Sequence, residues 1–272
     1  MSRIQKVCEQ AASQSRKLLV PYIVAGDPDT DASLALMHEL VVSGADIIEL
    51  GIPFSDPSSD GPVIQRGVER ALAGGTTLAD TLQLVARFRE QDDSTPIVLM
   101  GYLNPIEIMG YEAFVKAALE VGIDGVLTVD MPPAESSTLH TMLRAADIDT
   151  IYLVAPTTTP ARAKSIVEHS SGYLYYVSLK GVTGAALIDH ESVATKIAEL
   201  RALSALPVMI GFGIKDGPSA AAMAKLADGV IIGSALVERI ATLTRGELPT
   251  TAQLREITDV IAVARQAIDT LE

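Results

Sequence analysis

The sequence predicts a (β/α)8 barrel of the TIM type, an α/β fold that forms a single domain over residues 1–272. About eight short apolar segments alternate with helical segments along the chain. The apolar segments are near-continuous runs of Val, Ile and Leu, which is typical of parallel strands covered on both faces. No GxGxxG motif follows the first of them, and this disfavours a doubly wound open sheet, the structural alternative.

The first half of the chain begins with a helical pattern at 2–16, which we expect to be an extra N-terminal helix. The run KLLVPYIVA predicts the first strand, because it is apolar and ends at the turn sequence GDPD. Two helices are expected after the second strand, so one of them is an insertion into the repeating unit. The expected strands are 17–25, 47–50 and 96–100, and the expected helices are 31–42, 63–73, 78–90 and 111–121. A loop is expected at 101–105, between the third strand and the helix at 111–121.

The second half of the chain continues the same alternation. The sequence PTTTP at 156–160 provides a turn and the N-cap of the helix that follows it. Another helix is expected to open at Ser234, directly after the last strand. The expected strands are 125–129, 151–154, 173–177, 208–210 and 229–232, and the other expected helices are 134–146, 161–169, 192–203, 218–226 and 251–271.

A long, Gly-rich loop at 178–190 is the candidate lid of the barrel, with Gly181 and Gly184 as hinges. A loop that closes over a bound substrate excludes water and strengthens the local electrostatics. The alternative is an ordinary surface loop.

Composition excludes several classes of function. The formal charge of −13 argues against a nucleic-acid or anionic-membrane surface. Cys8 is the only cysteine, so no internal disulfide is possible, which fits a reducing compartment, here the cytoplasm. Neither a signal-peptide pattern nor an apolar run long enough to span a bilayer is expected. The four histidines are scattered without metal-ligand spacing, so no metal site is expected.

Acidic residues concentrate in the stretch ADIIELGIPFSDPSSDGP at 45–62. Glu49 stands near the end of the second expected strand, where water is scarce and ionisation is costly. Asp56 and Asp60 follow in the loop. Because active sites of such barrels lie at the carboxyl ends of the strands, these acids predict proton-transfer chemistry. For Asp56 the residues alone favour a simple turn-forming role.

The ends of the other strands predict two further features. An aromatic and aliphatic lining suits a flat apolar ring flanked by proton donors and acceptors. Glycines and a hydroxyl after the last strands predict a phosphate site, because exposed backbone N–H groups bind anions there. The lining residues are Tyr22, Met100, Tyr102, Leu127, Tyr175 and Phe212, and the phosphate residues are Gly184, Gly213, Gly233 and Ser234.

The chain resembles the α-subunit family of tryptophan synthase. The most specific segment is ELGIPFSDPSSDGP, which matches the family pattern ELGxPFSDPxxDGP. Matching segments run over nearly the whole chain: PYIVAGDPD, MGYLNP, GVLTVDMPPAES, LVAPTT, YYVSLKGVTGA, PVMIGFGI and GVIIGSALV. The resemblance implies a (β/α)8 barrel that cleaves indole-3-glycerol phosphate to indole and D-glyceraldehyde 3-phosphate.

The resemblance also implies roles and partners. It places the catalytic Glu at Glu49 and the catalytic Asp at Asp60, and it puts phosphate binding at the glycines and the serine named above. It implies no cofactor in this chain, and a pyridoxal-phosphate (PLP) β subunit that receives the indole within an α2β2 heterotetramer. Asp56, Pro57 and Asn104 correspond to subunit contacts, so the segment 53–57 between the two acids is a candidate relay to that partner.

Two departures from the family stand near the site. Ser59 occupies a position where the family usually has Ala, and Leu179-Lys180 stands where some members carry an Arg. Three other functions stay open at this point: an isomerase or epimerase of phosphorylated sugars, a non-catalytic regulatory partner, and a stand-alone lyase that releases free indole.

Overall fold

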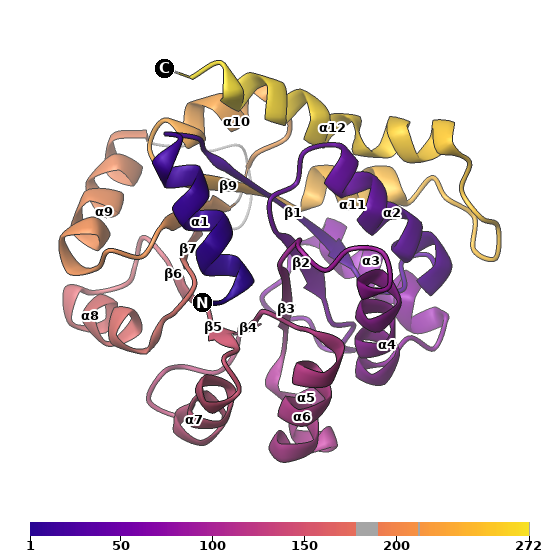
Figure 1. Cartoon of the computed structure of the whole chain (residues 1–272), viewed down its shortest axis with the longest axis horizontal. Coiled ribbons are helices and arrows are strands. Elements are labelled where there is room, and N and C mark those ends of the chain that lie inside the picture. The colour runs from indigo at the N-terminus through magenta and orange to yellow at the C-terminus, as the bar shows by residue number, and fades with distance from the viewer. Residues whose placement is uncertain (178–189, 212, 272) are drawn as a thin grey trace.

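The computed structural model describes residues 1–177, 190–211 and 213–271 (Figure 1). All its strand pairs are parallel, and its sheet has the order β5-β4-β3-β2-β1-β9-β8-β7-β6. The strands are β1 (Leu18–Val24), β2 (Ile48–Gly51), β3 (Ile97–Gly101), β4 (Gly125–Thr128), β5 (Asp149–Thr150), β6 (Tyr152–Val154), β7 (Leu174–Val177), β8 (Val208–Gly211) and β9 (Gly229–Ile232).

The two ends of this sheet order are joined by one short segment of chain. β5 pairs with β4 and β6 pairs with β7, yet only Ile151 separates β5 from β6. The backbone N–H of Ile151 continues the ladder by donating to the carbonyl of Val126 at 3.0 Å. β5 and β6 therefore act as one barrel strand that closes the sheet, so the predicted eight-stranded barrel is confirmed.

The helices of the described residues surround the barrel (Figure 1). Capping boxes fix where some of them begin: the Thr77 hydroxyl accepts from the Asp80 N–H while the Asp80 carboxylate accepts from Thr77. The helices are α1 (Arg3–Ser13), α2 (Thr30–Val42), α3 (Pro62–Ala73), α4 (Leu78–Arg89), α5 (Leu103–Met109), α6 (Tyr111–Val121), α7 (Ser137–Ala145), α8 (Pro160–His169), α9 (His190–Leu203), α10 (Gly217–Ala224), α11 (Ser234–Ile240) and α12 (Thr251–Asp269).

Two helical expectations need correction. α5 begins at Leu103, within the loop expected at 101–105, because Pro105 lies in its first turn, where a missing N–H costs nothing. Gly110, with φ of +84°, then separates α5 from α6. The helix expected at 134–146 begins only at Ser137, since Ser136 makes a turn hydrogen bond to the carbonyl of Pro133. The extra N-terminal helix and the inserted helix after β2 are present as expected.

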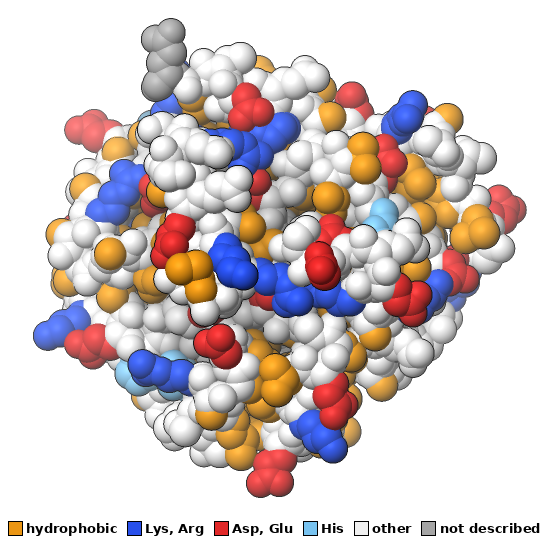
Figure 2. Space-filling model, viewed as in Figure 1, with side chains coloured by type: hydrophobic (Ala, Val, Ile, Leu, Met, Phe, Trp, Pro, Cys, Tyr) orange, Lys and Arg blue, Asp and Glu red, His pale blue; other side chains and the backbone are white. Residues whose placement is uncertain are grey.

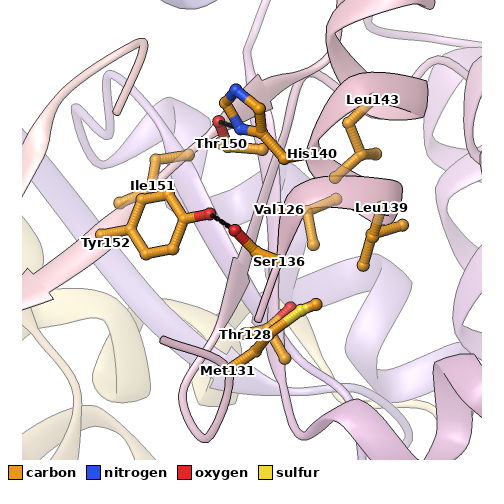
Figure 3. Close-up of a pocket in the computed structure, with 10 residues that line it drawn as sticks. All are labelled: Val126, Thr128, Met131, Ser136, Leu139, His140, Leu143, Thr150, Ile151 and Tyr152. Carbon is orange, nitrogen blue, oxygen red and sulfur yellow. Dashed lines mark hydrogen bonds between the residues drawn. The ribbon is translucent and has the colours of Figure 1, made fainter. Parts of the chain in front are cut away.

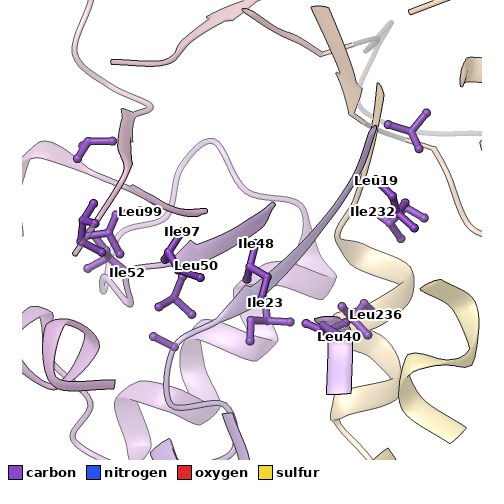
Figure 4. Close-up of a cluster of buried hydrophobic side chains, with 14 of the residues drawn as sticks. Leu19, Ile23, Leu40, Ile48, Leu50, Ile52, Ile97, Leu99, Ile232 and Leu236 are labelled. Carbon is purple, nitrogen blue, oxygen red and sulfur yellow. The ribbon is translucent and has the colours of Figure 1, made fainter. Parts of the chain in front are cut away.

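Apolar side chains fill the space between the barrel and its helices. Figure 4 shows Ile23 of β1 beside Leu40 of α2 and Leu236 of α11, and Leu19 of β1 beside Ile232 of β9. Because side chains alternate along a strand, the neighbours of these residues point into the barrel instead. This outer layer is mainly aliphatic, and its buried aromatic members are Phe88, Phe114, Tyr152 and Tyr176.

A second apolar cluster fills the interior of the barrel. Leu18, Val20 and Ile231 lie in it, together with Ile4 and Cys8 of α1. The N-terminal helix therefore closes one end of the barrel with its buried face. Burial in this cluster also raises the pKa of the Cys8 thiol to about 12. The opposite end, where the strands finish, is left for the predicted site.

The surface around α1 carries acidic and basic side chains in a mixed pattern, with small apolar areas between them (Figure 2). Among the described residues no helix is long and apolar enough to cross a membrane. The same residues contain no cluster of three or more His, Cys, Asp or Glu side chains arranged to hold a metal ion.

Candidate active site

The register of the sheet sets Glu49 in the middle of the barrel wall. Its backbone lies opposite Tyr22 of β1 and Val98 of β3. Both Glu49 and Tyr22 point inwards, and the Glu49 side chain is 0% exposed. A carboxyl group in such a place is mounted on a rigid strand and is removed from water.

Burial controls the protonation of Glu49. One carboxyl oxygen, Oε1, accepts a hydrogen bond of 2.6 Å from the hydroxyl of Tyr173. The other, Oε2, is buried and makes no hydrogen bond to any residue that the structure describes. Burial raises the pKa of Glu49 to about 8, although the Tyr173 hydrogen bond opposes the rise. Glu49 therefore holds a proton at neutral pH, the state that a general acid needs.

Tyr173 is a site residue that the sequence prediction missed. It lies two residues before Tyr175, so strand alternation turns both side chains towards the barrel interior. That alternation was the available signal, because Tyr175 was already expected to point inwards. Tyr173 is fully buried, with a side chain 0% exposed.

Asp60 lies on the loop after β2 and is anchored by Tyr102. The Tyr102 hydroxyl donates to Asp60 Oδ2 at 3.1 Å and accepts from the backbone N–H of Ser59 at 2.9 Å. The ring of Phe54 packs against Tyr102 with a centroid separation of 5.4 Å. Burial raises the pKa of Asp60, and the hydrogen bond from Tyr102 works against the rise. Tyr102, expected as ring lining, therefore also holds the loop of the second acid.

The end of the Asp60 loop that leads into α3 is held by a side chain of that helix. The side-chain N–H group of Gln65 donates to the carbonyl of Asp60 at 2.9 Å. Arg70, one turn further along α3, makes two hydrogen bonds of 2.7 Å to the buried carboxylate of Asp27. Bidentate pairs of this kind fix orientation as well as distance. The helix that follows Asp60 is thus tied to the loop after β1.

Five of the six lining residues named above, together with the two acids, form one connected group, which Tyr102 joins through its hydrogen bond to Asp60. Met100, Leu127 and Tyr175 belong to the apolar cluster inside the barrel. The pKa of Tyr175 is raised well above its ordinary value by burial and then by the charges of Glu49 and Asp60. Tyr22 is affected in the same way. Phe212 lies outside the described residues, so its expected contact with the ring stays a prediction.

The expected phosphate residues are only partly described. Gly213 follows β8 and has a φ of +75°, a conformation that favours glycine. Gly233 follows β9 and precedes Ser234, where α11 begins as expected. β8 and β9 are paired, so Gly213 and Gly233 come at the ends of adjacent strands. Gly184 and the expected lid at 178–190, apart from His190 in α9, lie outside the described residues.

The residues expected to contact a partner lie on the surface near this loop. Asp56 is exposed and Pro57 half-buried, and both line a hollow of about 350 Å³ between the loop and α3. Asn104 is exposed on α5. A smaller cavity of about 20 Å³ lies between α7 and the barrel wall (Figure 3). There Tyr152 donates to Ser136 at 2.7 Å, and none of the predicted site residues lines the cavity.

A parallel barrel that carries a protonated carboxyl on one strand and a second acid on the next loop is an acid–base enzyme of the barrel class. Residues 8–266 match the family model described as tryptophan synthase alpha chain. The chain belongs to the tryptophan synthase alpha chain family.

Individual relatives agree with this assignment over the full length. The chain is 53% identical to the tryptophan synthase alpha chain of Marinobacter nauticus, with 100% of this chain and 99% of that one covered. It is also 53% identical to that of Thioalkalivibrio sulfidiphilus, covering 99% and 100%. The crystal structure of the alpha subunit from Legionella pneumophila superposes with a TM-score of 0.90 at 43% identity and covers 100% of both chains.

The family assignment fixes the reaction. The alpha chain is a carbon–carbon lyase that cleaves indole-3-glycerol phosphate to indole and D-glyceraldehyde 3-phosphate in tryptophan biosynthesis. Its indole goes to a beta subunit, so the family implies a protein partner, and the alpha chain itself is known to need no cofactor. The isomerase and regulatory alternatives are therefore set aside.

Proposed function

We propose that Glu49 and Asp60 divide the proton transfers of the cleavage between them. The observation that carries this proposal is the difference in their settings: Glu49 is fully buried on a strand with a pKa of about 8, and Asp60 lies on a loop beside Tyr102. Two carboxyl groups in unlike surroundings can hold different protonation states at one pH.

Glu49 acts first as an acid and then as a base. Its proton goes to C3 of the indole ring, which weakens the bond between C3 and the glycerol carbon. The resulting carboxylate accepts the proton of the hydroxyl on that carbon as the bond breaks and the aldehyde forms. The electrons of the broken bond return to the ring, and Glu49 ends the cycle protonated, as it began.

Asp60 acts at the opposite edge of the ring. Protonation of C3 places positive charge on the indole nitrogen, and an ionised Asp60 stabilises that charge by hydrogen bonding to the N–H or accepting its proton. Tyr102 supports this role, because its hydrogen bond favours the charged form of Asp60. Met100, Leu127 and Phe212 flank the ring, and Tyr175 holds the ring and the glycerol chain.

The phosphate of the substrate binds at the ends of β8 and β9 in this scheme. Gly213 and Gly233 supply backbone N–H groups, Ser234 adds a hydroxyl, and Gly184 contributes from the expected lid. The placement of Gly213 and Gly233 on adjacent strand ends supports this assignment. A site formed from N–H groups explains how a chain of formal charge −13 can bind an anionic substrate.

The partner completes tryptophan synthesis. We propose an α2β2 heterotetramer in the cytoplasm, in which PLP is bound only by the beta subunit. Asp56, Pro57 and Asn104 form the contact, and the segment 53–57 transmits the presence of the partner to Asp60. Support comes from the exposed position of Asp56 and Asn104 close to the Asp60 loop. The leading alternative is a stand-alone lyase that releases free indole.

One set of assays tests these assignments. Release of indole from indole-3-glycerol phosphate is measured for the wild-type chain and for Asp56→Ala, each with and without a beta subunit. We expect the beta subunit to accelerate the wild-type reaction, and a higher concentration of it to be needed for Asp56→Ala. Full activity of the isolated wild-type chain would support the stand-alone lyase. An unchanged concentration dependence in Asp56→Ala would remove Asp56 from the contact.

A further inference from the structure

Tyr22 lies along the wall of the site between its two ends. A Cβ atom built on Gly51 would lie 2.2 Å from the Tyr22 hydroxyl oxygen and 2.7 Å from Cζ. At the other end of the side chain, a Cβ built on Gly233 would lie 3.5 Å from Cδ1 and 3.6 Å from Cβ of Tyr22. The side chain therefore runs from the end of β9 towards the end of β2, and the hydroxyl needs the space that glycine leaves at Gly51.

The hydroxyl of Tyr22 has no partner within the protein as described. The side chain is only 8% exposed, and it makes no hydrogen bond to any residue that the structure describes. The hydroxyl oxygen is not among the fully buried side-chain atoms of the described residues that lack a partner, so it reaches the solvent inside the site. The two catalytic acids do not supply that partner: Glu49 is bonded to Tyr173 and Asp60 to Tyr102. A bound ligand that displaces this solvent would have to replace it as the hydrogen-bond partner of the hydroxyl.

The position of the hydroxyl indicates which part of a ligand it meets. β1 lies between β2, which carries Glu49 and leads to Asp60, and β9, which leads to Gly233. A substrate with its ring at the acids and its phosphate at Gly233 must extend its three-carbon chain across β1. Apart from the phosphate, the polar groups of that chain are hydroxyls, which both donate and accept hydrogen bonds.

We propose that the Tyr22 hydroxyl forms a hydrogen bond with a hydroxyl of the substrate's glycerol chain, and so selects a hydroxylated chain over a plain alkyl chain. This inference rests on the proposed placement of ring and phosphate. A site that hydrogen-bonds a substrate hydroxyl disfavours the analogue that lacks it, because its own polar group then stays unpaired. Tyr22 thus acts through its hydroxyl as well as through the ring face predicted to line the pocket.

Two ligands that differ only in the chain hydroxyls test the proposal. They are indole-3-glycerol phosphate and indole-3-propanol phosphate, which has the same ring, chain length and phosphate. Dissociation constants are measured by calorimetry in a Glu49→Gln chain, which prevents turnover, with and without Tyr22→Phe. We expect Tyr22→Phe to weaken binding of the glycerol ligand about tenfold and to change binding of the propanol ligand less than twofold.

The control is Tyr152→Phe in the same background, because the Tyr152 hydroxyl is bonded to Ser136 outside the barrel interior. It should alter neither dissociation constant. Equal weakening of both ligands by Tyr22→Phe would indicate lost packing and overturn the proposal, as would no weakening of either. If the Glu49→Gln chain binds neither ligand, the proposed substrate placement itself fails.

Discussion

The two acids of the site differ in how the fold holds them. Glu49 lies within β2, 0% exposed, and accepts a hydrogen bond from Tyr173, the residue directly before β7. Asp60 is half-buried on the loop between β2 and α3, and Tyr102 anchors it from the end of β3. Glu49 is held by a strand that is paired with β1 on one side and β3 on the other. Asp60 is held only by the few contacts that its loop makes.

The difference separates two tasks that both need a carboxyl group. A buried strand position keeps Glu49 protonated up to a pKa of about 8, and the strand cannot move it far. A loop position leaves Asp60 half-buried, beside the surface that carries Asp56, the residue proposed to contact the partner. In each case a tyrosine hydroxyl donates to the carboxyl and favours its charged form.

Removing the strand acid should have the largest effect. Glu49→Gln keeps the shape of the side chain and can still accept from Tyr173, but it cannot transfer a proton. We expect kcat/KM for indole formation to fall about 10³-fold, within the usual range for a general acid–base group. Residual activity above a tenth of the wild type would contradict the assigned role.

The same variant tests the raised pKa through stability. Between the ordinary pKa of 4.5 and about 8, the folded wild type retains a proton on Glu49 that the unfolded chain has lost. Its stability therefore falls as the pH rises through that window, by up to about 1.4 kcal/mol per pH unit from this group. Urea unfolding should show Glu49→Gln gaining stability relative to the wild type from pH 5 to pH 8.

Removing the hydrogen bond that anchors Asp60 should have an intermediate effect on the rate. Tyr102→Phe removes the hydroxyl that bonds both Asp60 and the backbone of Ser59. We expect a loss in kcat/KM of about tenfold, together with a higher pKa for Asp60. Because the proposed role of Asp60 requires its ionised form, the acidic limb of the pH–rate profile should move to higher pH. An unmoved acidic limb would show that Tyr102 only lines the ring.

Removing the hydroxyl of Tyr173, which is hydrogen-bonded to Glu49, should have the smallest effect on rate. Tyr173→Phe deletes a hydrogen bond that lowers the pKa of Glu49, so that pKa should rise further above 8. We expect kcat/KM at pH 7 to fall a few-fold, which corresponds to a loss of about 1 kcal/mol in transition-state stabilisation. The alkaline limb of kcat/KM should move to higher pH while the acidic limb stays in place. Movement of the acidic limb instead would reverse the assignment of the two acids.

The prediction from sequence was most successful where the pattern is local. The run at 229–232 predicted β9 to the residue, and the start of α11 at Ser234 was also correct. The prediction was less successful where the pattern is short or mixed: the seven-residue helix α5 contains a proline, and its first three residues were expected to belong to a loop. Glu49 could be singled out because an acid inside an apolar run needs a reason to be there.

The sequence by itself determined the eight strand–helix units, the aliphatic core, and the placing of one acid on a strand and another on the next loop. These properties depend on periodicity and turn chemistry within short segments. Only the tertiary structure decided the partners of the acids. Tyr173 reaches Glu49 across 124 residues, and Tyr102 reaches Asp60 across 42. The raised pKa of Glu49 follows from the same cause, because burial is produced by strands and helices that meet only when the barrel closes.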